Sequence, residues 1–222
     1  MRCLALLLCA FPFTANACGL ALVLAIDVSL SVDEAEFSLQ TDGIAQALRD
    51  PSVAAAIGSV EGGVAISLMQ WSGRDDQAVS VDWRHVDGAG RLAGLADEIA
   101  ATPRAFGSKT APGSALSYAM DLHRALPMTC ARHVTDVSGD GISNDGVETR
   151  VMRDQAVGLG HTINGLVILG DDTRLEAYYR HNVIGGPGHF LEIAYGFDDY
   201  GRAMREKLLK ELPRQVAMRP LP

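Results

Sequence analysis

The chain has 222 residues, of which 48% are hydrophobic and 21% charged, and its formal net charge is −8. This length and composition are ordinary for one globular domain that buries its own core. The acidic balance argues against a nucleic-acid or anionic-membrane surface, because such surfaces need clustered Lys and Arg.

The N-terminus has the pattern of a secretory signal peptide. Arg2 is followed by an apolar run at 4–13 and by an Ala-x-Ala cleavage site that ends at Ala17. The apolar run is too short to anchor the chain in a bilayer, and no later stretch has the length of a transmembrane helix. We therefore predict a periplasmic or secreted protein with a signal peptide, one domain and a C-terminal tail: 1–17, 18–213 and 214–222.

Four cysteines are present, and Cys3 and Cys9 would leave with the signal peptide. Cys18 and Cys130 remain, which is an even pair in an oxidising compartment. Lipidation of Cys18 is the alternative to ordinary secretion. Lipoprotein signals normally place a Leu-like residue three positions before the cysteine, where this chain has Ala15.

Short apolar strands alternate with helical segments along the rest of the chain. The predicted strands are 20–26, 64–71, 77–83, 131–138, 162–169 and 190–194. The predicted helices are 31–49, which a capping box at Ser31 opens, 92–101, 112–126, 147–159, 173–182 and 198–212. This order predicts an α/β fold: a doubly wound, mostly parallel six-stranded sheet with helices on both faces and an antiparallel edge strand at 77–83.

Oxygen-bearing side chains follow three of these segments at positions where ligands bind in open α/β sheets. They are Asp27, Ser29 and Ser31 after the first strand, Thr110 before a helix, and Asp140 after the fourth strand. Two carboxylates and three hydroxyls are hard donors that suit Mg²⁺, Mn²⁺ or Ca²⁺ better than zinc or copper. Ser31 also has a simpler interpretation as a helix N-cap.

In these residues the chain resembles von Willebrand factor type A (VWA) domains with a metal-ion-dependent adhesion site. That family has Asp-x-Ser-x-Ser after strand one, a Thr before a Gly-x-Ala-Leu helix, and Asp-Gly after strand four. The run 136–141 and the secretory start are similar to a bacterial subgroup, the domain-of-unknown-function 1194 family. The resemblance implies that the two Ser and the Thr coordinate the ion, that the Asp residues help directly or through water, and that an open position accepts an Asp or Glu of a protein partner.

The resemblance also implies that strands one and four are parallel neighbours. Cys18 and Cys130 would then lie at the same end of the sheet, opposite the metal, where we expect a disulfide. Asp136 lies within the fourth strand, so we favour a structural, buried carboxylate bonded to backbone or a hydroxyl. The alternative is that Asp136 holds the metal ligands in place without contacting the ion itself.

The sequence therefore predicts a metal-dependent binding module without catalytic activity. It lacks Gly-x-Ser-x-Gly and a dinucleotide-binding glycine pattern, and its six His have no metal-ligand spacing. Trp71 is predicted to pack in the core, and Arg104 and Lys109 to rim the site. The alternative is a metal-dependent hydrolase at the same site, for which Asp136 is the only spare carboxylate nearby.

Overall fold

The computed structural model describes residues 17–170 and 172–212. Its strands are β1 Ala17–Asp27, β2 Val64–Trp71, β3 Gln77–Val86, β4 Thr129–Gly139, β5 Thr162–Ile168 and β6 Leu191–Ala194. Its helices are α1 Glu34–Arg49, α2 Pro51–Gly58, α3 Ala89–Ala100, α4 Pro112–Arg124, α5 Thr149–Gly158, α6 Leu175–Tyr178 and α7 Tyr200–Glu211, with a π-helical turn at Tyr179–Val183 and a 3₁₀ turn at Phe197–Asp199. None of the helices in this part of the chain is long and apolar enough to cross a membrane.

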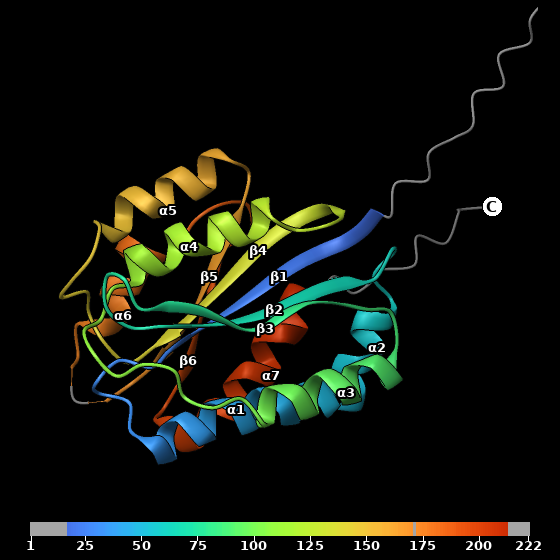
Figure 1. Ribbon diagram of the computed structural model, residues 1–222, viewed down its shortest axis with the longest axis horizontal. Coiled ribbons are helices and arrows are strands. Elements are labelled where there is room, and N and C mark those ends of the chain that lie inside the picture. Colours follow the sequence, from blue (N-terminus) through green and yellow to red (C-terminus); the bar gives the residue numbers. More distant parts are fainter. Residues whose placement is uncertain (1–16, 171, 213–222) are drawn as a thin grey trace, which may run out of the picture.

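The strands form one six-stranded sheet in the order β3-β2-β1-β4-β5-β6. β3 pairs antiparallel with β2, and the other neighbouring strands pair in parallel. Helices α4, α5 and α6 lie on one face of the sheet, and α1, α2, α3 and α7 lie on the other (Figure 1). The predicted fold class is confirmed.

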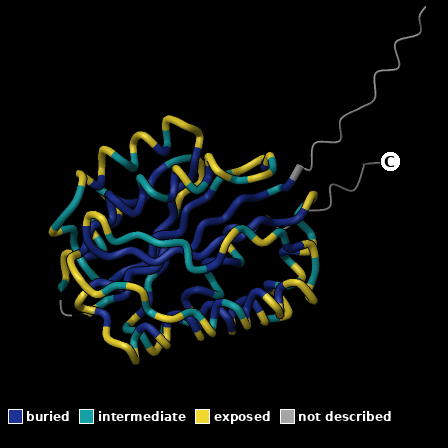
Figure 2. The backbone as a smooth tube through the Cα atoms, in the orientation of Figure 1, coloured by how far each residue is buried: buried dark blue, intermediate teal, exposed yellow. Residues whose placement is uncertain are grey.

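The centre of the sheet is buried on both faces, as Figure 2 shows for the strands between the helix layers. Every residue of β1 from Leu20 to Ile26 is at most 1% exposed. Alternate side chains of this strand enter two separate apolar clusters, Leu22 and Leu24 towards α1 and α7, and Val23 and Ala25 towards α4. This explains why β1 is almost continuously apolar instead of alternating with polar residues.

Three local predictions were wrong. The capping box that opens α1 belongs to Asp33, whose carboxylate accepts from the backbone N–H of Glu36 at 2.8 Å, while Glu36 accepts from the N–H of Asp33. Ser31 therefore lies outside the helix. Helix α2, which begins at Pro51, was not predicted. The helix predicted at 173–182 is split into α6 and the π-helical turn.

Parallel pairing of β1 with β4 places Cys18 directly opposite Cys130, and the two form a disulfide with their Cα atoms 4.4 Å apart. Both cysteines are nearly buried. The bond lies at the amino ends of the two strands, opposite the edge where Asp27 and Gly139 end them. The predicted disulfide is confirmed, and it occupies the sulfur that a lipid anchor on Cys18 would require.

We expect replacement of both cysteines in C18A/C130A to lower the free energy of unfolding by up to about 4 kcal/mol, because the bond closes a long loop in the unfolded chain. Urea unfolding of the oxidised wild type and of the variant measures the difference. Reductant should destabilise the wild type and leave the variant unchanged. Equal unfolding free energies without reductant, together with two titratable thiols in the denatured wild type, would contradict the bond.

A cluster of three histidines lies between α4 and the sheet. The ring centroids of His123, His133 and His161 are 4.8 to 5.2 Å apart. Nε2 of His123 lies 3.1 Å from the Thr135 hydroxyl, and its Nδ1 lies 3.2 Å from Nδ1 of His133. Burial, together with His161 and His133, lowers the pKa of His123 to about 3, and burial also lowers the pKa values of the other two. The cluster is therefore neutral at pH 7.

Because the folded state lowers these pKa values, the unfolded chain binds more protons below the ordinary histidine value of 6.5. Stability should fall as the pH drops through 6.5 and continue to fall towards 3. We expect His123→Gln, which keeps a polar partner for Thr135, to reduce the loss of unfolding free energy between about pH 7 and about pH 4 by on the order of 2 kcal/mol. His189→Gln, on an exposed loop, is the control; equal acid dependence of both variants would contradict the role of the cluster.

Candidate metal site

The five residues predicted to hold a cation come together at the carboxyl edge of the sheet. Asp27 is the last residue of β1, and Asp140 directly follows β4. Since these strands are parallel neighbours, with Ile26 opposite Ser138, both carboxylates lie at the same edge. Thr110 lies two residues before α4, which covers one face of the sheet at this edge.

A chain of hydrogen bonds joins four of the five residues. The Ser29 backbone N–H donates to Oδ1 of Asp27 at 2.7 Å. The Ser29 and Ser31 hydroxyls are 3.2 Å apart, and the Ser31 hydroxyl donates to Oδ1 of Asp140 at 2.7 Å. The Asp-x-Ser-x-Ser segment and the Asp140 loop, which are far apart in the sequence, therefore share one polar cluster.

Thr110 lies on the other side of the Asp140 loop. A Cβ placed on Gly141 would be 3.2 Å from Cγ2 of Thr110 and 3.5 Å from its hydroxyl oxygen, so the glycine lets the loop approach this side chain. The Thr110 N–H donates to the Asn144 side-chain oxygen at 2.9 Å, and the Asn144 N–H donates back to the Thr110 carbonyl at 2.9 Å. Asn144 fixes the position of Thr110, and no sequence motif indicated it.

The cluster runs from the interior to the surface. Asp27 and Ser29 are fully buried, Thr110 is 6% exposed, Asp140 is partly exposed, and Ser31 is exposed. An ion at this cluster would therefore have buried ligands on one side and access to solvent on the other.

The electrostatics of the site favour a positive charge. Burial and the nearby Asp140 raise the pKa of Asp27 to about 7, and burial raises the pKa of Asp140. Oδ2 of Asp27 is buried and has no hydrogen-bond partner among the described residues, and the same holds for the Tyr179 hydroxyl, which faces it across Gly139. A buried oxygen without a partner is costly, so a cation that accepts its lone pair fits this position.

Within the described residues, no three His, Cys, Asp or Glu side chains are placed to hold a metal ion together. A site here must therefore complete its coordination with hydroxyl oxygens, which the two serines and the threonine supply. Such an all-oxygen set fits a hard divalent cation.

The family model described as a protein of unknown function, DUF1194, matches residues 17–216. The chain belongs to this family. No curated protein matches it significantly.

Solved structures show that the DUF1194 chain has the fold of VWA domains. Proximal thread matrix protein 1 from the mussel byssus matches with a TM-score of 0.66 and 12% identity over 86% of this chain and 47% of that one. A von Willebrand factor type A protein from Catenulispora acidiphila matches with a TM-score of 0.62 and 15% identity over 87% of this chain and 43% of that one. The pilus adhesin SpaC from Lactobacillus rhamnosus GG matches with a TM-score of 0.62 and 14% identity over 87% of this chain and 31% of that one. The chain spans less than half the length of each of these structures.

In this DUF1194 protein, Arg104 braces the Asp-x-Ser-x-Ser segment. Its guanidinium donates to the carbonyls of Val28 and Ser29 at 3.2 and 3.0 Å, and its side chain is only 15% exposed. The side-chain amide of Gln40 on α1 donates to the Asp27 carbonyl at 3.0 Å from the other side. Arg104 was predicted to rim the site as a solvated loop charge; instead it is largely buried and orients the backbone that carries the candidate ligands.

Ser72, which directly follows β2, fixes the loop before Thr110. Its hydroxyl accepts from the Ser108 N–H at 2.8 Å and donates to the Lys109 carbonyl at 3.0 Å, while its own carbonyl accepts from the Ala111 N–H at 2.8 Å. The Lys109 side chain is exposed on this loop, as predicted for a residue at the rim.

Asp136 does not join the site. Its carboxylate points to the face of the sheet that α7 covers, where it contacts the ammonium of Lys207. Asp136 is buried, as a structural carboxylate would be, and its partner is a lysine from a distant helix and not backbone or a hydroxyl. Its side chain faces α7 and not the five candidate ligands.

We expect Arg104→Met to lower the free energy of unfolding by about 2 kcal/mol, because it leaves two carbonyls without their charged donor. Arg74→Met is the matched control, since Arg74 lies near the same edge but is 63% exposed and makes only a 3.6 Å ion pair with Asp145. Urea unfolding measures both variants. If Arg104→Met were no more destabilising than Arg74→Met, the bracing role would be refuted.

Proposed function

We propose that this protein is an extracytoplasmic interaction module that binds one divalent cation through Asp27, Ser29, Ser31, Thr110 and Asp140. One observation carries the proposal: two segments linked by the Ser31–Asp140 hydrogen bond surround an Asp27 carboxylate that is fully buried and half unpartnered. A cation would relieve both the repulsion between the two carboxylates and the cost of burying Asp27.

Mg²⁺ is the ion we propose, with Mn²⁺ or Ca²⁺ as substitutes. All five ligands are oxygens, which these ions prefer. One similar structure of proximal thread matrix protein 1 is described with a zinc-occupied MIDAS motif, which supports a divalent ion in this fold. In the proposed site each of the two carboxylates also accepts a hydrogen bond, which leaves the ion under-neutralised, so an open position facing solvent would attract a further carboxylate.

The surroundings suit a protein partner that presents this carboxylate as an Asp or Glu. Leu30, between the two serines, is 78% exposed and offers an apolar contact next to the ion. On the other side of Asp140 lies a depression of about 450 Å³ whose lining includes Glu36, Asp172 and Asp198. A basic residue flanking the partner's carboxylate would fit this acidic depression.

Export of the chain is part of the proposal. The Cys18–Cys130 disulfide supports an oxidising compartment such as the periplasm or the exterior. The proposed signal peptide 1–17 and tail 214–222 fall outside the described residues, apart from Ala17 at the start of β1. The hydrolase alternative loses its supporting observation, since its candidate base, Asp136, contacts Lys207 on another face of β4.

The proposed site predicts that millimolar Mg²⁺ or Mn²⁺ raises the thermal unfolding midpoint of the wild type. At a concentration about 100 times the dissociation constant, binding would add about 2.7 kcal/mol of stability. Asp27→Asn and Thr110→Val should abolish the shift, because the first removes the carboxylate charge and the second a hydroxyl oxygen, while both preserve side-chain volume. Differential scanning calorimetry with and without chelator measures it.

Asp172→Asn is the control for unspecific binding to acidic surface, since Asp172 lines the neighbouring depression; this variant should keep the full shift. A wild-type midpoint that does not respond to either metal would refute the cation site. A shift that survives Asp27→Asn would place the ion elsewhere. If the shift depends on Asp27, a pull-down with the immobilised protein identifies the partner: it is the protein retained from periplasmic extract only in the absence of chelator.

A further inference from the structure

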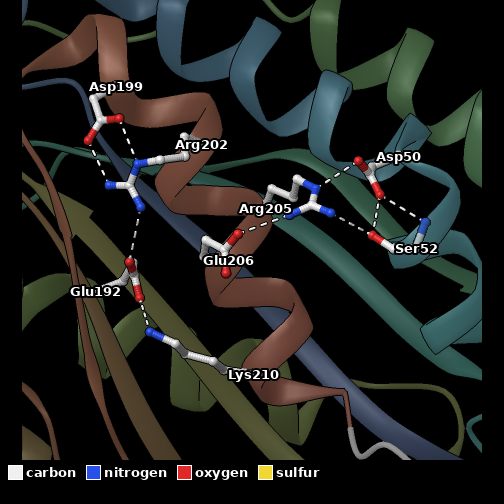
Figure 3. A network of polar contacts seen from close by, with 8 residues as sticks. All are labelled: Asp50, Ser52, Glu192, Asp199, Arg202, Arg205, Glu206 and Lys210. Atoms are coloured by element: carbon white, nitrogen blue, oxygen red, sulfur yellow. Dashed lines mark hydrogen bonds and ion pairs between the residues drawn. The ribbon is translucent and has the colours of Figure 1, made fainter.

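The inner face of α7 carries two charged residues into the core. The buried positions of this helix are Tyr200, Ala203, Met204, Lys207, Leu208 and Glu211. Their spacing of three or four residues is the core-facing stripe of an amphipathic helix, so Lys207 and Glu211 occupy places where apolar residues are expected. The other charges of α7 lie in a network that includes Arg202, Arg205 and Lys210 and their carboxylate partners (Figure 3).

The Lys207 ammonium lies between two carboxyl groups. It contacts Oδ1 of Asp136 on β4 and donates to Oε1 of Glu211 at 2.7 Å. The Asn164 side chain on β5 also donates to Oε1 of Glu211 at 2.7 Å, and the Phe190 ring centroid is 5.2 Å from the ammonium. Lys207 is 0% exposed, and the other polar members of this group are at most 3% exposed.

The three charges cannot all be retained in this dry interior at low cost. One ammonium and two carboxylates together carry a net negative charge, and each buried ion loses its hydration. Burial and the nearby Glu211 raise the pKa of Asp136 well above its usual range, whereas Lys207 lowers the pKa of Glu211. The two shifts favour the neutral acid form for Asp136 and the carboxylate form for Glu211.

Apart from the Lys207 ammonium, few groups fix the Asp136 carboxyl. Neither of its oxygens has a hydrogen bond of ordinary geometry to the described residues, whereas Glu211 is held by both Asn164 and Lys207. An amine source, an un-ionised acid and an anchored carboxylate thus meet where water is excluded. This is the set of groups that amide formation requires: a nucleophile, an electrophile and a proton acceptor.

We propose that Lys207 and Asp136 condense to an intramolecular isopeptide bond that ties α7 to the central strand β4. The bond would form between Nζ of Lys207 and Cγ of Asp136. It would replace an ammonium and a carboxylic acid by one neutral amide, which is much less costly to bury than an ion.

The atoms and protons balance without a co-reactant. One proton passes from the Lys207 ammonium to Oε1 of Glu211, which lies 2.7 Å away. This transfer is uphill, because the neighbouring carboxyl groups raise the pKa of Lys207 and Lys207 lowers that of Glu211. The resulting amine attacks Cγ of the protonated Asp136. One Asp136 oxygen leaves as water, carrying the carboxylic acid proton and a second proton from the nitrogen. The products are a secondary amide with one N–H, one water molecule, and a protonated Glu211 that can donate a hydrogen bond to the new amide oxygen.

The neighbouring pair of Lys210 and Glu192 is a built-in comparison. It also joins an α7 lysine to a carboxylate, and its ammonium lies 5.8 Å from the same Phe190 ring. The Lys210 side chain is 51% exposed, however, and within the described part of the chain its ammonium contacts a single carboxylate. Because the Lys210 ammonium is open to solvent, no bond is expected at this pair.

Mass spectrometry of the purified full chain tests the bond. After reduction and denaturation, the wild type should be lighter by one water than its sequence requires. Trypsin should fail to cleave after Lys207, and tandem spectra should show the peptide containing Asp136 joined to the peptide containing Lys207. Lys207→Arg and Glu211→Gln should restore the unlinked mass, since the first removes the amine and the second the proton acceptor. Lys210→Arg should keep the linked mass.

Separate Asp136 and Lys207 peptides from a folded wild type, with the unmodified total mass, would overturn the proposal. A linkage to Asn164 with loss of ammonia, or a linkage that persists in Lys207→Arg, would also overturn it. These results do not depend on whether the variants fold well, because the wild-type mass alone decides. They are also independent of the proposed metal site, which lies beyond the ends of β1 and β4.

Discussion

The parallel pairing of β1 with β4 is the constraint on which the other features of this protein depend. One register sets Cys18 against Cys130 at one end of the strand pair and brings Asp27 beside the Asp140 loop at the other. A shift by one residue would turn every side chain of a strand to the opposite face of the sheet. The disulfide and the candidate cation site would be lost together, so each supports the assignment of the other.

The strand β4 divides its polar residues between two environments. Thr135 and His133 face α4 and belong to the neutral histidine cluster, whereas Asp136 faces α7 and its buried lysine. Asp140 lies beyond the end of the strand, where no further strand residue covers it. Carboxylates only four residues apart therefore have different chemistry, because one meets a buried ammonium and the other meets hydroxyls at the edge of solvent.

The candidate site is held by residues that do not themselves face the ion. Arg104, Gln40, Ser72 and Asn144 each bind the backbone of a segment that carries a candidate ligand. Such bracing matters because a coordination sphere tolerates only small displacements of its oxygens, and loops without it would lose the required geometry. The π-helical turn that begins at Tyr179 also shapes the site, since the Tyr179 hydroxyl and Oδ2 of Asp27 both lie next to Gly139.

The sequence by itself determined the fold class and most strand positions, because these follow from local periodicity. The resemblance to VWA domains pointed to the disulfide pair and to five candidate oxygen ligands at the ends of strands. The sequence misplaced the start of α1, since Ser31 and Asp33 are both good N-caps and only the fold decides which one turns towards Asp140. It also had no means of pairing Asp136 with Lys207 or Arg104 with the Val28 carbonyl, because those contacts join positions 71 and 76 residues apart. Tertiary structure decided them, since the charge state and partner of a buried polar group depend on which distant element packs over it.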